Sequence, residues 1–134
     1  MSKSVPGQSS ELPALNDWLH AQWEAAGLAP DTCFTFELAL EEVFINVAMH
    51  AAKPGFMPQV ELVFERDGEH VSLAVCDDGP AFDPLAAPPP DVDAALEDRP
   101  VGGLGIYLIR EMMDDVTYQR TGARNCLRMV KRVG

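Results

Sequence analysis

The sequence predicts an α+β fold: a two-layer α/β sandwich in which a mostly antiparallel, mixed sheet carries about three helices on one face. The first observation is length, because 134 residues suffice for a single domain with its own core, spanning 1–134. The second is hydrophobic periodicity, which changes along the chain between helical and strand-like. The third is the order of the elements: helix, helix, strand, strand, long loop, helix, strand, strand. This order is typical of a sheet covered by helices on one face.

Composition narrows the classes of function. Acidic residues outnumber basic ones by 21 to 10, and because phosphate attraction supplies most nucleic-acid affinity, no direct nucleic-acid binding is expected. No apolar run reaches the ~20 residues of a bilayer span, and the start lacks a signal-peptide core, so we expect a cytoplasmic protein without a membrane partner. Cys33, Cys76 and Cys126 are widely spaced and form no CxxC pair. They are predicted to be free thiols.

The N-terminal part of the chain is predicted to begin with a flexible tail or a degenerate, short edge strand over residues 1–9. A first helix follows, with Ser9 or Ser10 as its N-cap and Pro13 in its first turn. Gly27 is typical of the residue that ends such a helix.

The central helix is predicted over residues 36–52. Its core-facing arc consists of Phe36, Leu40, Val43, Phe44, Val47 and Ala51. Glu42 and Asn46 lie one turn apart in a gap between two apolar arcs, with His50 a further turn on, so their side chains point to one place. Burying them unpaired would cost several kcal/mol, which predicts a polar ligand there. An ordinary amphipathic helix with helix-favouring Glu and a stray Asn is the alternative.

Alternating apolar residues predict two strands, 60–64 and 71–75, joined by a tight turn at Asp67-Gly68. Residues 83–101 contain five prolines and few large apolar groups, so we expect a long functional loop with at most one short helix, Val92–Leu96.

The C-terminal part is predicted to contain a third helix that starts at the glycine-rich stretch 102–105. A closing hairpin of strands 116–121 and 126–133 around Gly122 completes the domain.

Three sets of residues are candidates for chemistry. An Asn46 oxygen suits Mg²⁺, and Glu42 one turn away can take the proton of a hydroxyl group. Asp77 at a strand end can accept a hydrogen bond from an exocyclic amine, and Gly79 lets a flat base approach the backbone; a plain Asp-Asp-Gly turn is the alternative. The glycines of 102–105 expose backbone N–H groups at a helix start, which suits phosphates.

The order of these motifs resembles the histidine-kinase-like ATPase superfamily, which has the Bergerat ATP-binding fold, and within it the bacterial anti-sigma-factor serine/threonine kinases. The resemblance runs from about Leu12 to the C-terminus. It rests on the phrases EEVFINVAMHA, DDGPAFDP and RPVGGLGIYLIREMMDDVTY. The family implies ATP and Mg²⁺ as cofactors.

The resemblance also implies a role for each matching position. Glu42 is the catalytic base, and residues 84–101 are the ATP lid. The nucleotide-binding positions are Asn46 (as the Mg²⁺ ligand), Asp77 (on the adenine amine), Gly79, Ala81, Arg99, Gly102, Gly103, Leu104 and Gly105. Ala81 stands where the family's Asp-x-Gly-x-Gly box has its second glycine. Arg99 is the only Lys or Arg between Arg66 and Arg110, so we expect it to contact the γ-phosphate.

The function implied by the resemblance is that of a protein kinase. It would phosphorylate a Ser or Thr of an anti-anti-sigma (STAS-type) protein and, in its other state, sequester a sigma factor; a homodimer is left open. The alternative is a non-catalytic, nucleotide-gated binding module of the same fold. The presence of Glu42 favours the kinase, because a pure binding switch needs no base. The chain has no phosphoacceptor-histidine hairpin, which excludes a sensor histidine kinase.

Overall fold

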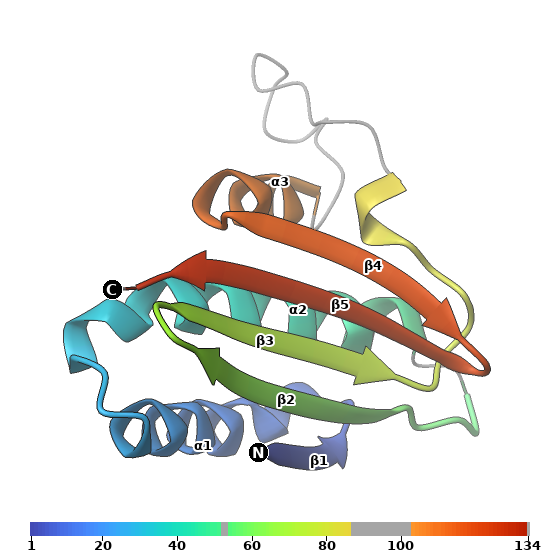
Figure 1. Cartoon of the computed structure of the whole chain (residues 1–134). Coiled ribbons are helices and arrows are strands. Elements are labelled where there is room, and N and C mark those ends of the chain that lie inside the picture. The colour runs from blue at the N-terminus through green and yellow to red at the C-terminus, as the bar shows by residue number, and fades with distance from the viewer. Residues whose placement is uncertain (52–53, 87–102, 134) are drawn as a thin grey trace.

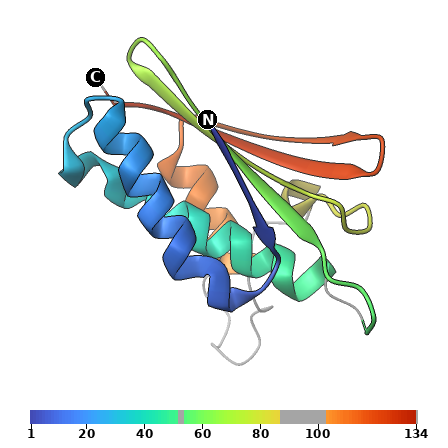
Figure 2. The ribbon, with the colours of Figure 1, turned by 90° about the horizontal axis from the view of Figure 1, so that it is seen from below.

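The computed structural model describes residues 1–51, 54–86 and 103–133. Its sheet has five strands in the order β1-β2-β3-β5-β4, and each neighbouring pair is antiparallel. Helices α1, α2 and α3 lie on one face of this sheet (Figures 1 and 2). The predicted two-layer α+β architecture is therefore confirmed, and the described sheet is antiparallel rather than mixed.

The elements follow the predicted order closely. The strands are β1 (Ser2–Pro6), β2 (Gln59–Asp67), β3 (His70–Asp77), β4 (Asp115–Thr121) and β5 (Arg124–Arg132). The helices are α1 (Leu12–Ala25), α2 (Phe34–Ala51) and α3 (Gly103–Met112), with short 3-10 helices η1 (Ser9–Glu11), η2 (Pro30–Cys33) and η3 (Pro84–Ala86). Of the two options for residues 1–9, the structure has the edge strand, because β1 pairs with β2.

The start of α1 differs from the prediction. Ser9 and Ser10 lie in η1, and the residues that precede η1 and α1 are Gln8 and Glu11, neither of which makes a side-chain capping hydrogen bond. Pro13 lies in the first turn of α1, as predicted. The helix therefore begins from a tighter preceding turn, which orients the backbone without a serine cap.

Helix α2 forms the centre of the helical layer. Its predicted core arc is buried, with Val47 partly exposed, while Leu38 and Met49 on the other arc are 36% and 50% exposed. Asn46 is only 8% exposed and is the buried polar residue of this helix. The helix thus brings one amide group into an otherwise apolar contact with the sheet.

Both predicted hairpins are present, and glycine makes each turn. Gly68 has a φ of 60° and Gly122 a φ of 61°, a left-handed conformation that side chains with a Cβ adopt at a cost. Asp67 pairs with His70 across the first turn. These turns set the register within the β2–β3 hairpin and within the β4–β5 hairpin.

The prediction of free thiols is wrong for two of the three cysteines. Cys76 on β3 and Cys126 on β5 are direct partners in the strand register, with Cα atoms 4.1 Å apart, and form a disulfide. A separation of 50 residues gave no indication of this pairing, because it depends on strand register. Cys33 is free and buried, and burial, followed by the nearby Glu37 carboxylate, raises the pKa of its thiol to about 12.

Some predicted features lie outside the described residues: the short helix Val92–Leu96, Arg99, Gly102 and all of the expected lid 84–101 except Pro84–Ala86. Among the described helices, none combines the length and apolar character needed to cross a membrane.

Candidate functional site

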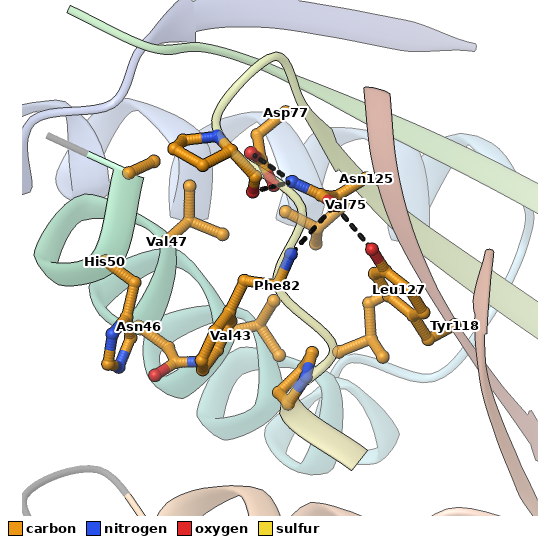
Figure 3. Close-up of a pocket in the computed structure, with 13 residues that line it drawn as sticks. Val43, Asn46, Val47, His50, Val75, Asp77, Phe82, Tyr118, Asn125 and Leu127 are labelled. Atoms are coloured by element: carbon orange, nitrogen blue, oxygen red, sulfur yellow. Dashed lines mark hydrogen bonds between the residues drawn. The ribbon is translucent and has the colours of Figure 1, made fainter. Parts of the chain in front are cut away.

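A pocket opens between the C-terminal half of α2 and the neighbouring ends of β3 and β5 (Figure 3). Its volume, including the open mouth, is about 420 Å³. The lining side chains with polar or aromatic groups are Asn46, His50, Asp77, Phe82, Tyr118 and Asn125. The other lining residues are apolar, so the few polar groups would determine how a ligand is oriented.

Asp77 is the last residue of β3 and is 6% exposed. Its Oδ1 accepts hydrogen bonds from the backbone N–H of Gly79 (2.9 Å) and from Nδ2 of Asn125 (3.1 Å). Within the described residues no group donates to Oδ2. The carboxylate therefore forms the predicted turn and also retains one acceptor oxygen at the pocket.

Gly79 has a reason to be glycine that the sequence did not indicate. A Cβ at this position would lie 2.6 Å from the Cβ of Ala51 and 3.4 Å from its Cα. The bare backbone therefore lets the segment after β3 pack against the last turn of α2. Ala81 is exposed, and its neighbours Pro80 and Phe82, rather than Ala81 itself, line the pocket.

Glu42 is exposed and lies one turn before Asn46 on α2, outside the pocket lining. Its side chain contacts the start of α3: a Cβ on Gly105 would lie 2.7 Å from the Glu42 carboxylate carbon. Helix α2 thus carries Asn46 into the pocket and Glu42 to the glycine-rich helix start. Gly103 is the first residue of α3, next to Leu104.

His50 and Phe82 line the pocket as a pair of stacked aromatic rings. Their rings stack with centroids 4.3 Å apart and an angle of 16° between the planes. Figure 3 shows this stack on the α2 side of the pocket, with Asp77 and Asn125 across from it. The facing sides of the two rings cover each other, so a ring-shaped ligand could stack only on an outer face of this pair.

Asn125 is the site residue that sequence reasoning missed. It faces Asp77 in the register of β3 and β5 and is 5% exposed. Its amide bonds both to Asp77 and to the backbone of the segment after β3. A polar residue at an inward position of a strand, in alternation with Leu127 and Met129, was the available indication.

A second cluster of polar side chains lies away from the pocket, at the other end of the helical layer. Nε2 of His20 on α1 contacts Oε1 of Glu37 on α2. A ring nitrogen of His20, a carboxylate oxygen of Glu37 and Sγ of Cys33 lie within 4.8 Å of one another. Because burial raises the pKa of the Cys33 thiol to about 12, it stays protonated at neutral pH. We interpret this cluster as a contact that joins α1 to α2.

Comparison with known proteins places these features in context. The family model for the histidine kinase-like ATPase domain matches residues 5–131. The serine/threonine-protein kinase BtrW of Bordetella bronchiseptica is 35% identical over 94 residues, which cover 70% of this chain and 66% of that protein. The serine-protein kinase RsbW of Bacillus cereus is 31% identical over 116 residues, 84% of this chain and 72% of that protein. The chain thus spans slightly less than two thirds of BtrW.

Solved structures agree on the fold. The histidine kinase domain of the blue-light activated histidine kinase of Erythrobacter litoralis superposes with a TM-score of 0.55 over 96% of this chain and 62% of that one. Histidine kinase AdeS of Acinetobacter baumannii superposes with a TM-score of 0.53 over 100% of this chain and 68% of that one. The sequence identities are 14% and 12%, so these likenesses bear on the fold alone.

Proposed function

From the premise that the chain belongs to the histidine kinase-like ATPase domain family, we propose that it is a protein kinase. It binds ATP in the pocket between α2, β3 and β5 and transfers the γ-phosphoryl group to a Ser or Thr of another protein. The names of the relatives BtrW and RsbW support serine/threonine as the acceptor class.

Two features of the pocket suit an adenine base. Adenine carries an exocyclic amine, and Asp77 offers a buried carboxylate whose Oδ2 has no donor among the described residues. A hydrogen bond to a charged group contributes about 1.5–3 kcal/mol. An outer face of the stacked rings of His50 and Phe82 provides a flat surface for the base.

Asn46 fits the role of metal ligand. Its side chain lines the pocket and no hydrogen bond joins it to the described part of the chain, so its amide oxygen is available to coordinate an ion. A bound Mg²⁺ would neutralise phosphate charge. We assign the phosphate contacts to the stretch 102–105 and Arg99, and lid closure to residues 84–101, by family resemblance.

The observation that carries the kinase proposal is the contact between Glu42 and Gly105. It holds a carboxylate at the start of α3, one turn from the Asn46 that faces the pocket. In the proposed reaction the acceptor hydroxyl oxygen bonds to the γ-phosphorus, the bond from that phosphorus to the bridging oxygen breaks with its electron pair leaving on ADP, and the hydroxyl proton goes to Glu42.

The partners are proposed from the resemblance. The acceptor is an anti-anti-sigma (STAS-type) protein, and in its other state the kinase holds a sigma factor. Charge is compatible with this proposal, because a net charge of −11 disfavours direct contact with nucleic acid.

The test compares Glu42→Gln, Asn46→Ala and the matched control Glu41→Gln, which changes a neighbouring exposed carboxylate of α2. Phosphate transfer to a purified anti-anti-sigma protein, ATP titration and thermal melting are measured for each. We expect Glu42→Gln to keep ATP affinity and lose ~10²–10⁴ in transfer rate. Asn46→Ala should weaken Mg-ATP binding itself, and Glu41→Gln should change neither quantity.

Two outcomes would contradict the proposal. Full transfer by Glu42→Gln would remove Glu42 from the mechanism. A wild-type protein that binds ATP and captures its partner but phosphorylates nothing would indicate the nucleotide-gated binding module instead.

A further inference from the structure

The side chain of Asn125 connects three segments at the back of the pocket. Nδ2 donates to Oδ1 of Asp77 (3.1 Å) and to the carbonyl oxygen of Pro80 (2.9 Å). Oδ1 accepts from the hydroxyl of Tyr118 (2.5 Å), from Nη1 of Arg120 (3.1 Å) and from the backbone N–H of Phe82 (3.3 Å). One amide therefore joins β3, β4 and the rim segment after β3.

The partners determine the orientation of this amide. A carboxylate and a carbonyl oxygen only accept, whereas a guanidinium and a backbone N–H only donate. The reverse orientation would set the amide oxygen against Asp77 and Pro80 and the NH₂ group against Arg120 and Phe82. Only one orientation satisfies the network, and in it the donors and acceptors of Asn125 are all used.

A saturated amide has no group left for a ligand, so its contribution to binding must act through the groups that it holds in place. Two hydrogen bonds hold Oδ1 of the Asp77 carboxylate, one from Asn125 and one from Gly79, and this leaves Oδ2 for the pocket. The same amide holds Pro80 and Phe82, which line the pocket rim.

We propose that Asn125 is a positioning residue for nucleotide selection: it holds the Asp77 carboxylate and the rim at residues 80–82 in the geometry that accepts the amine of adenine and rejects guanine. This inference rests on the proposed ATP-binding function and adds a determinant of its base specificity. Guanine presents a carbonyl oxygen where adenine presents its amine, so a fixed carboxylate oxygen repels it. A carboxylate free to rotate discriminates less between the two bases.

The experiment uses two substitutions that keep the size of the side chain. Asn125→Asp replaces the donor that faces Asp77 with an acceptor, and Asn125→Leu removes both donor and acceptor. The control Gln119→Ala changes an exposed β4 residue that pairs with Cys126 and lies on the other face of the sheet. ATP and GTP affinities are measured by calorimetry on the folded full chain, with melting curves for each variant.

We expect both Asn125 variants to lose roughly tenfold or more in ATP affinity and to lose most of their preference for ATP over GTP. Asn125→Asp should regain ATP affinity relative to wild type when the pH falls from about 7.5 to about 5.5, because two adjacent carboxyl groups share a proton that restores the donor. Asn125→Leu has no such proton and should regain none. The other titratable or charged groups at the site, His50, Tyr118 and Arg120, are the same in wild type and in both variants. The ratio of variant to wild-type ATP affinity at each pH therefore reports on position 125 alone.

The remaining outcomes are separable. A wild-type chain that binds no ATP would reject the proposed function, and this inference with it. If wild type prefers ATP and both folded variants keep that preference, Asn125 has no role in selection. If both variants fail to fold while Gln119→Ala folds, Asn125 serves folding rather than selection and the proposal is overturned.

Discussion

Replacing Gly105 with alanine tests the place of Glu42 without substituting Glu42, and saturating ATP separates this effect from any weaker ATP binding at the proposed phosphate contacts of 102–105. The new Cβ would lie 2.7 Å from the Glu42 carboxylate carbon and closer still to one carboxylate oxygen, so the side chain must move away. Glu42 is exposed and flexible, and alanine favours a helix over glycine by up to about 1 kcal/mol, so stability should change little. A displacement on the order of 1 Å costs a catalytic group up to about 10²-fold in rate.

Gly79→Ala is the matched control, because it adds the same methyl group at another of the predicted nucleotide-binding glycines. There the clash is with Cβ and Cα of Ala51, which cannot rotate away. Overpacking of this kind costs about 1–3 kcal/mol of stability. We therefore expect Gly105→Ala to melt like wild type and transfer phosphate slowly, and Gly79→Ala to melt earlier.

The assay is phosphate transfer at saturating ATP, with denaturant melts of the same preparations. Wild-type transfer by Gly105→Ala would refute the argument that the position of Glu42 matters. A loss of stability equal to that of Gly79→Ala would refute the argument that the Glu42 side chain can move.

Three further predictions concern single groups. Asp77→Asn should weaken ATP binding by about 1.5–3 kcal/mol, because the amide can present a donor to the adenine amine; equal ATP and GTP affinities of wild type in calorimetry would contradict this role. Reduction of the Cys76–Cys126 disulfide by a dithiol should lower the free energy of unfolding by at most about 4 kcal/mol, since the bond spans 50 residues; urea melts with and without reductant measure it, and identical melts would argue against the bond. The raised pKa of Cys33 means that the folded state keeps a thiol proton that the unfolded state releases above about pH 9.0, so stability should fall as pH rises from there towards about 12. Cys33→Ala should lose less stability than wild type over that interval in denaturant melts, and parallel losses would show that the thiol does not contribute.

The local sequence determined most of the elements and the first candidates for the site. Hydrophobic periodicity predicted α2, and alternating apolar residues with turn residues predicted the two hairpins. Both signals depend only on neighbours within a few positions in the chain. Glu42, Asn46 and Asp77 could be selected because Glu42 and Asn46 are one turn apart on a helix between apolar arcs and Asp77 stands at the end of a strand. The prediction of a serine N-cap for α1 was wrong because the 3-10 turn η1 precedes the helix and already sets the direction of the chain. Capping preferences do not describe such a turn.

Tertiary structure decided which of these groups meet. Asn125 faces Asp77, and Cys76 faces Cys126, only because β5 lies beside β3 in one particular register, although β4 precedes it in the chain. The reasons for glycine at 79 and 105 likewise come from the approach of α2 to other segments. Strand register and helix approach are set by packing between residues far apart in the chain, and no local pattern contains that information.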